Sequence, residues 1–206
     1  MFNTHQNEIG HFARESAGNM ARVYQFVITT VQQSLVDTPN FMSDIDTQGD
    51  KSKHLWGWKR DAFTFSIENA DAIFDTSMTI YREISDPEIV RHELLKFFAG
   101  LPGLGLVKGG FMVQLCFGLS GCIDTHNINR FGLDDKTFKA ARFKGAKTDK
   151  TRNAIVRAYH EIVDACGGCA ALWDEWCEHV ASRQPQNYDN AFDVSAIHVL
   201  AIKGKA

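Results

Sequence analysis

The segment LPGLGLVKGGFMVQLCFGLSGCIDTHN, residues 101–127, decides the fold expected for this chain. It opens with a glycine-rich turn and ends in Asp-Thr-His, residues 124–126. Gly103 and Gly105 permit positive φ without strain and are expected to leave the backbone uncovered, as a tight turn requires. The segment therefore predicts a short turn, then a helix, then a loop that presents one carboxylate.

A helix is predicted immediately before the turn, in residues 85–100. Ser85 or Asp86 provides an N-cap, Pro87 suits the first helical position, and Gly100 suits the end. These signals are local, so they predict the helix independently of the rest of the fold.

A second helix is predicted after the turn, in residues 106–118, despite Gly109 and Gly110. A glycine inside a helix costs roughly 1 kcal/mol relative to alanine. A helix tolerates that cost where its backbone is closely approached, either by another helix or by a nucleic acid. Helix, turn and helix together predict a helix-hairpin-helix unit in residues 86–118.

The turn has the features of an anion-binding site. Leu101 and Leu104 can anchor it in the core, and the free N–H groups at the start of the second helix point outward. A DNA phosphate is the expected anion at such a helix end. Lys108 lies in the first turn of that helix and can reinforce the contact, which positions DNA without reading its sequence.

Helical spacing of apolar residues recurs along most of the chain, so the expected fold class is mostly α, with one helical unit over residues 1–206. Pro39 and the polar residues 43–53 predict a loop. Residues 195–202 fit either a short strand or a helix. Further helices are predicted in residues 8–35 (with a weak point at Gly18), 68–84, 150–166 and 169–182.

Charge is distributed unevenly. The net charge of the 206 residues is -3, yet residues 136–157 hold eight Lys/Arg and one acid. Such a basic patch, including Lys144 and Lys147, fits either phosphate binding or an ordinary solvated surface.

The five cysteines are expected to be reduced, because their number is odd and no signal peptide precedes them. Cys166, Cys169 and Cys177 have the spacing Cys-x2-Cys-x7-Cys, without a fourth cysteine in the run. Buried free thiols are the favoured interpretation and a metal site is the alternative, so no metal and no cofactor is expected. No apolar run reaches the ~18 residues of a membrane span, which predicts a cytoplasmic protein.

The sequence of residues 101–131, LPGLGLVKGGFMVQLCFGLSGCIDTHNINRF, resembles the signature of the helix-hairpin-helix DNA glycosylase superfamily, which includes endonuclease III. The resemblance covers roughly residues 85–133 and implies a two-lobed helical fold. It places a catalytic aspartate at Asp124, in the loop and helix start of residues 119–133. It also implies a DNA partner whose backbone is bound at the turn and whose target nucleotide is flipped out of the stack.

Two departures qualify the resemblance. Bifunctional members of the family carry a nucleophilic lysine at the position of Val107, and the iron–sulfur members carry four cysteines near the C-terminus. Lys108 is one residue later, about 100° around the helix, so it is expected to face DNA or solvent while Val107 faces the pocket. The resemblance therefore implies neither a Schiff-base lyase nor a cluster.

Three further side chains are pocket candidates. Trp56 and Trp58 can stack on an extruded base, or they can belong to the core. His126 can orient Asp124, contact a phosphate or be structural.

Three functions are compatible with these residues. The first is a monofunctional DNA glycosylase, in which Asp124 stabilises the sugar cation as the N-glycosidic bond breaks. The second is a phage enzyme that hypermodifies a DNA base, similar to thymidine pyrophosphorylase-like proteins. The third is a non-catalytic DNA-binding or virion-associated module. The setting would be the cytoplasm of a bacterium or of a phage-infected host.

Overall fold

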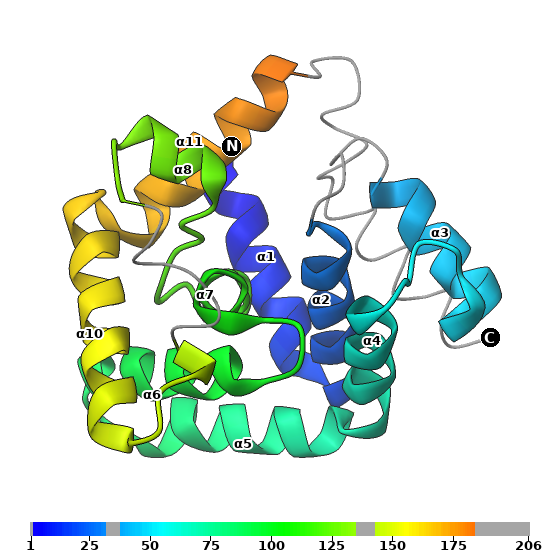
Figure 1. The fold of residues 1–206 in the computed structure, drawn as a ribbon, viewed down its shortest axis with the longest axis horizontal. Coiled ribbons are helices and arrows are strands. Elements are labelled where there is room, and N and C mark those ends of the chain that lie inside the picture. The colour runs from blue at the N-terminus through cyan, green and yellow to red at the C-terminus, as the bar shows by residue number, and fades with distance from the viewer. Residues whose placement is uncertain (1, 32–37, 135–142, 184–206) are drawn as a thin grey trace.

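The computed structural model describes residues 2–31, 38–134 and 143–183, and these ranges contain helices and no strand (Figure 1). The predicted mostly α fold class is confirmed. The α-helices are α1 (Phe2–Glu15), α2 (Ala17–Thr29), α3 (Thr38–Gln48), α4 (Trp58–Glu68), α5 (Ala70–Glu83), α6 (Pro87–Gly100), α7 (Gly105–Phe117), α8 (Thr125–Arg130), α10 (Asp149–Ala165) and α11 (Gly168–Arg183). A short 3-10 helix, η2 (Gly49–Lys51), follows α3.

Helix α7 is the centre of the structure. It packs against α6, α1 and α2, while α10 packs against α6 and α11 (Figure 1). Eleven of the thirteen residues of α7 are buried, and the two that are not are Val107 and Lys108. An almost completely buried helix holds both of its ends in fixed positions relative to the surrounding elements.

The helices on either side of the turn were predicted correctly. Asp86 is the N-cap of α6, and its carboxylate accepts hydrogen bonds from the N–H groups of Glu88 and Ile89. Helix α7 ends at Gly118, which has φ +68°. The break between α10 and α11 also lies at the predicted glycines, Gly167 and Gly168, both with positive φ.

The predicted single helix over residues 8–35 is, in its described part up to residue 31, two helices, α1 and α2. The chain is extended at Ser16 (φ −158°, ψ 159°), and the Ser16 hydroxyl accepts a hydrogen bond from the Asn19 N–H at 3.2 Å. Gly18 lies inside the first turn of α2 and is not the break. A serine N-cap satisfies a free N–H group of the new helix, which glycine lacks the side chain to do.

The loop predicted after Pro39 is wrong, because this segment forms α3. A proline at the start of a helix loses no hydrogen bond, so Pro39 does not oppose the helix. Met42 and Ile45, three residues apart, are each 2% exposed. Asp46 forms an ion pair of 2.6 Å with Arg22 of α2.

Two more segments differ from expectation or fall outside the description. Residues 58–68 were not predicted as a helix but form α4, which begins after Gly57 at φ +51°. Residues 195–202 lie outside the described ranges.

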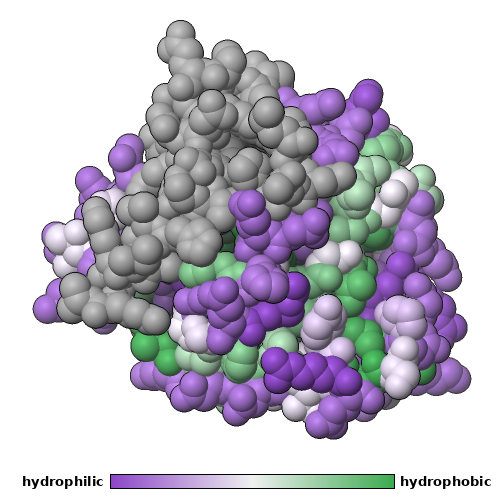
Figure 2. Space-filling view, turned by 180° about the vertical axis from the view of Figure 1, so that it is seen from behind, coloured by the Kyte–Doolittle hydropathy of each residue, from purple (hydrophilic) through white to green (hydrophobic). Residues whose placement is uncertain are grey.

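No helix in the described ranges combines the length and apolarity that a membrane span needs. Figure 2 shows one face of the molecule, where hydrophilic side chains cover much of the edge and smaller hydrophobic areas lie between them.

Candidate nucleic-acid interface and active site

The turn between α6 and α7 comprises residues 101–104 and is held from both sides. Gly103 has φ +77° and Gly105 has φ +72°, which are conformations that favour glycine. Leu104 is 5% exposed, and Leu101 packs against the core from a half-buried position. The turn is therefore anchored as predicted from its two leucines.

Helix α4 fixes the outer side of the turn. A Cβ on Gly103 would lie 2.7 Å from the Cβ of Ala62 and 3.2 Å from the ring of Trp58. Gly103 is thus required both for its positive φ and for the close approach of α4. The Tyr24 hydroxyl donates to the Pro102 carbonyl, which ties the turn to α2 as well.

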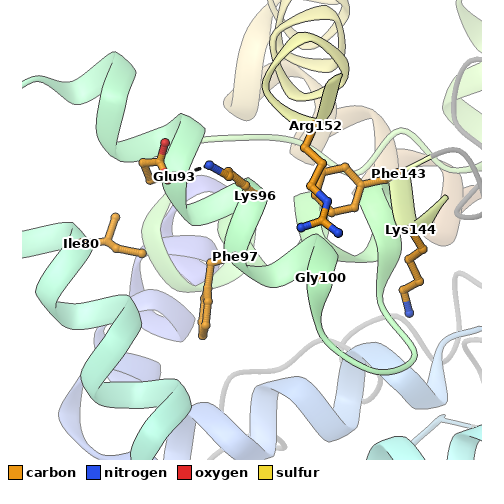
Figure 3. A pocket seen from close by; sticks show the side chains of 8 residues that line it. All are labelled: Ile80, Glu93, Lys96, Phe97, Gly100, Phe143, Lys144 and Arg152. Carbon is orange, nitrogen blue, oxygen red and sulfur yellow. Dashed lines mark ion pairs between the residues drawn. The ribbon is translucent and has the colours of Figure 1, made fainter. Parts of the chain in front are cut away.

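A basic cavity of about 500 Å³ opens beside the turn (Figure 3). Lys96, Lys144 and Arg152 line it together with Gly100, the last residue before the turn. Arg152 is oriented by a hydrogen bond from its Nε to the Ala146 carbonyl at 3.2 Å. The remaining lining residues are Ile80, Glu93, Phe97 and Phe143.

The predicted basic patch is therefore brought next to the turn in part. Lys144 and Lys147 are exposed, and Lys144 lines the same cavity as Gly100. The sign and position of these charges suit a polyanion lying across the turn. Basic residues 136, 139 and 142 lie outside the described ranges.

The loop between α7 and α8, residues 118–124, is held by hydrogen bonds to Tyr159 of α10. The Tyr159 hydroxyl donates to the Gly121 carbonyl at 2.8 Å and accepts from the Ile123 N–H at 3.1 Å. Tyr159 is 1% exposed, and burial raises its pKa well above the usual value. The hydroxyl is thus a permanent donor that joins two backbone groups of the loop.

The side-chain amides of Gln114 and Asn127 also hold this loop. Gln114 Oε1 accepts from the Cys122 N–H at 3.0 Å, and Gln114 Nε2 donates to the Cys169 carbonyl at 3.1 Å. Asn127 Nδ2 donates to the Cys122 carbonyl at 2.7 Å. The loop is therefore held on three sides, by α7, α10 and α8.

Asp124 stands at the end of this loop, half-buried, as the N-cap of α8. Its Oδ1 accepts a hydrogen bond from the Asn127 N–H at 3.1 Å. This hydrogen bond fixes the direction of the carboxylate. It also gives Asp124 a structural role, as the N-cap that stabilises the start of α8. Of the other pocket candidates, Val107 is half-buried against the core and His126 is half-buried directly after Thr125.

The two glycines inside α7 are explained by contacts within the protein. A Cβ on Gly109 would lie 2.8 Å from the Ala99 nitrogen of α6. A Cβ on Gly110 would lie 2.5 Å from the Gly121 carbonyl oxygen and 2.7 Å from the Tyr159 hydroxyl. Gly109 admits α6, and Gly110 admits the loop that carries Asp124.

Lys108, which was predicted to face DNA or solvent, is half-buried, and its ammonium turns toward α2. Its ammonium donates to the Thr30 hydroxyl at 3.2 Å and lies 5.3 Å from the centre of the Phe111 ring. Phe111 in turn packs against Trp176 of α11, with ring centroids 5.2 Å apart.

Trp56 and Trp58 are not core residues. They are 46% and 38% exposed, with ring centroids 6.4 Å apart at an interplanar angle of 71°. Part of each ring is therefore exposed to solvent. Trp173 and Trp176, in contrast, are buried and stacked on each other.

All five cysteines are free, and four of them are buried. Burial raises the pKa of Cys116 and of Cys122 to about 12, so both are protonated thiols. The described residues contain no group of three or more His, Cys, Asp or Glu side chains placed to hold a metal. The cysteine side chains are thus buried or half-buried, as predicted.

A second cavity, of about 450 Å³, was not predicted from the sequence. It lies between α6 and α10, and His92, Asn153, Arg157 and His160 are among its lining residues. His160 is 5% exposed, and burial together with the positive charge of Arg91 lowers its pKa to about 3. His160 therefore carries a neutral ring at neutral pH.

Sequence reasoning also missed Tyr159 and Gln114, whose roles depend on contacts between distant segments. Comparison with protein-family models, with curated proteins and with solved structures gives no match to this chain.

Proposed function

We propose that this protein is a DNA-binding enzyme that flips a nucleotide and acts on its base, by monofunctional cleavage of the N-glycosidic bond. The observation that carries the proposal is the placement of Asp124. Its loop is hydrogen-bonded on three sides, and the same helix, α7, begins at the turn that would bind the DNA backbone.

The chemistry requires a carboxylate of fixed position. As the bond between base and sugar breaks, positive charge develops on the sugar, and a carboxylate beside C1′ stabilises that charge. A preoriented group costs no reorganisation when the charge appears. The hydrogen bond from the Asn127 N–H to Asp124, and the hydrogen bond from the Ile123 N–H to Tyr159, supply that orientation.

Binding of DNA is assigned to the turn and the basic cavity beside it. The turn leads into the N-terminus of α7, where the helix dipole favours an anion. Lys144 and Arg152 line the cavity and add positive charge there, and the exposed Lys147 follows Lys144 closely in the chain. These groups contact phosphates and therefore position the duplex without selecting its sequence.

A non-catalytic DNA-binding module is the second candidate, because the N-cap alone explains why Asp124 is present. Asp124→Asn separates the two candidates. Asparagine caps a helix as well as aspartate, so the variant keeps its fold but loses the negative charge.

The experiment uses duplexes that carry different modified bases, with mass spectrometry of the nucleosides after incubation. Base loss by the parent, abolished in Asp124→Asn while DNA affinity is retained, is the expected result. Alteration of a base without its loss would point instead to base hypermodification. Full activity of Asp124→Asn on a substrate of the parent would refute the catalytic role.

A further inference from the structure

Two lysines of different helices meet at the C-terminal end of α2. Lys59 of α4 donates from its ammonium to the Val31 carbonyl, and Lys108 of α7 donates to the Thr30 hydroxyl. Burial lowers the pKa of Lys59, and the positive charge of Lys108 lowers it further. The two ammonium groups are therefore close enough to repel each other.

The burial of this pair is unusual for lysine. Lys59 is 1% exposed, although lysine is almost never fully buried without a partner. Neither Lys59 nor Lys108 forms an ion pair with a carboxylate in the described ranges. Among the residues that the structure describes, the cluster thus holds two positive charges without an anionic partner.

Capping of α2 accounts for only part of this charge. The C-terminal end of a helix is equivalent to about half of a negative elementary charge. Two ammonium groups exceed that by a wide margin, and an uncompensated charge away from water is costly. An oxyanion would offset the remainder.

The surroundings of the pair indicate what else the ligand contains. The Lys59 ammonium lies 5.5 Å from the ring centre of Trp56 and 6.0 Å from that of Trp58. Both rings are partly exposed and stand edge-to-face, so each offers an aromatic surface next to the positive charge. Aromatic surface beside cationic side chains is the pattern that binds nucleotides.

We propose that Lys59 and Lys108 form a binding site for the phosphate of a nucleotide, whose base contacts Trp56 or Trp58. The phosphate contacts the half-buried Lys108, and Lys59 acts on it from the enclosed side. This site adjoins the turn, because the Trp58 ring lies against Gly103, but it does not include Asp124. Its nucleotide is either a free mononucleotide or a residue of a single strand.

The test measures quenching of tryptophan fluorescence by 2′-deoxyadenosine 5′-monophosphate. Trp173 and Trp176 are buried, so a bound base quenches Trp56 and Trp58. We expect saturable quenching that is about tenfold weaker in affinity with Lys108→Met, and similarly weaker with deoxyadenosine, which lacks the phosphate. Lys53→Met, at an exposed lysine nearby, is the control and should behave as the parent.

A second arm identifies the source of the phosphate. If the site takes a residue of a strand, quenching by the mononucleotide is absent, but a single-stranded oligonucleotide binds. Its slope of log affinity against log salt is then smaller by about 0.7 in Lys108→Met. The proposal is overturned if Lys108→Met binds both the mononucleotide and the oligonucleotide as the parent does.

Thermal melting accompanies each titration, since removal of one of two repelling charges should not destabilise the fold. Lys59→Met is a second variant, and Lys108→Met alone is sufficient if the buried Lys59 proves necessary for folding. The mononucleotide measurement involves no reaction and does not use Asp124. Its outcome is therefore independent of whether the protein cleaves a glycosidic bond.

Discussion

Replacing Tyr159 by phenylalanine removes the hydroxyl that holds the loop of residues 118–124. That hydroxyl donates to the Gly121 carbonyl and accepts from the Ile123 N–H, at 2.8 and 3.1 Å. All three residues are buried. In the variant, two buried backbone groups lose their partner at once.

The expected cost follows from the number of groups left unpaired. A buried polar group without a partner costs about 1–3 kcal/mol. Two such groups predict a loss of about 2–6 kcal/mol in the free energy of unfolding, since the phenylalanine ring fills the same space and adds no cavity term.

Tyr24→Phe is the matched control. Tyr24 is also fully buried, but the hydrogen bond of its hydroxyl is a single donation to the Pro102 carbonyl. Its removal leaves one unpaired group, so about half the loss is expected. Urea unfolding of both variants measures the difference, with the slope m expected to be unchanged.

Hydrogen exchange locates the effect. The Ile123 amide should exchange faster in Tyr159→Phe and remain protected in Tyr24→Phe. A loss of less than about 0.5 kcal/mol in Tyr159→Phe, with Ile123 still protected, would refute the idea that this hydroxyl holds the loop.

Three further predictions concern DNA binding, a lyase activity that we expect to be absent, and the dependence of stability on pH. Gly105→Val should weaken DNA binding sharply, because valine resists a φ of +72°. Lys144→Glu/Lys147→Glu should lower the slope of log affinity against log salt for duplex binding by about 0.9 for each phosphate that is no longer neutralised. An unchanged slope would remove these lysines from the interface. Borohydride should trap no adduct with abasic DNA, whereas an adduct that disappears in Lys108→Ala would identify Lys108 as a nucleophile. Folding lowers the pKa of His160 to about 3, so protonation favours the unfolded chain and stability falls as the pH drops below about 6.5. Between pH 7 and pH 5 this histidine should account for a loss of about 2 kcal/mol in the free energy of unfolding. An equally steep loss in His160→Gln would contradict this role.

The helices with strong local signals could be predicted from the sequence. Asp86 and Pro87 mark the start of α6 whatever surrounds it, and the glycines of the turn are required by backbone conformation. Helix α3 could not be predicted in the same way, because its polar sequence becomes helical by packing Met42 and Ile45 against distant segments.

The candidate site was predictable only where its residues lie close together in the chain. Asp124 and the turn belong to one segment, so their pattern is visible in the sequence. Tyr159 lies 36 residues after its partner Ile123, and no local signal distinguishes it from other tyrosines. Lys59 is followed by the exposed Arg60 in an ordinary basic pair, and only the fold buries the first of the two.

The burial of α7 makes its length a functional quantity. One inserted residue would rotate everything after it by about 100° around the helix axis and shift it by about 1.5 Å. Gly109 and Gly110 would then face the wrong neighbours, and the carboxylate of Asp124 would point in a different direction relative to the turn. An insertion or deletion within α7 should therefore not be tolerated, and under the proposed function the number of residues from Gly105 to Asp124 sets the spacing between the bound phosphate and the reacting sugar.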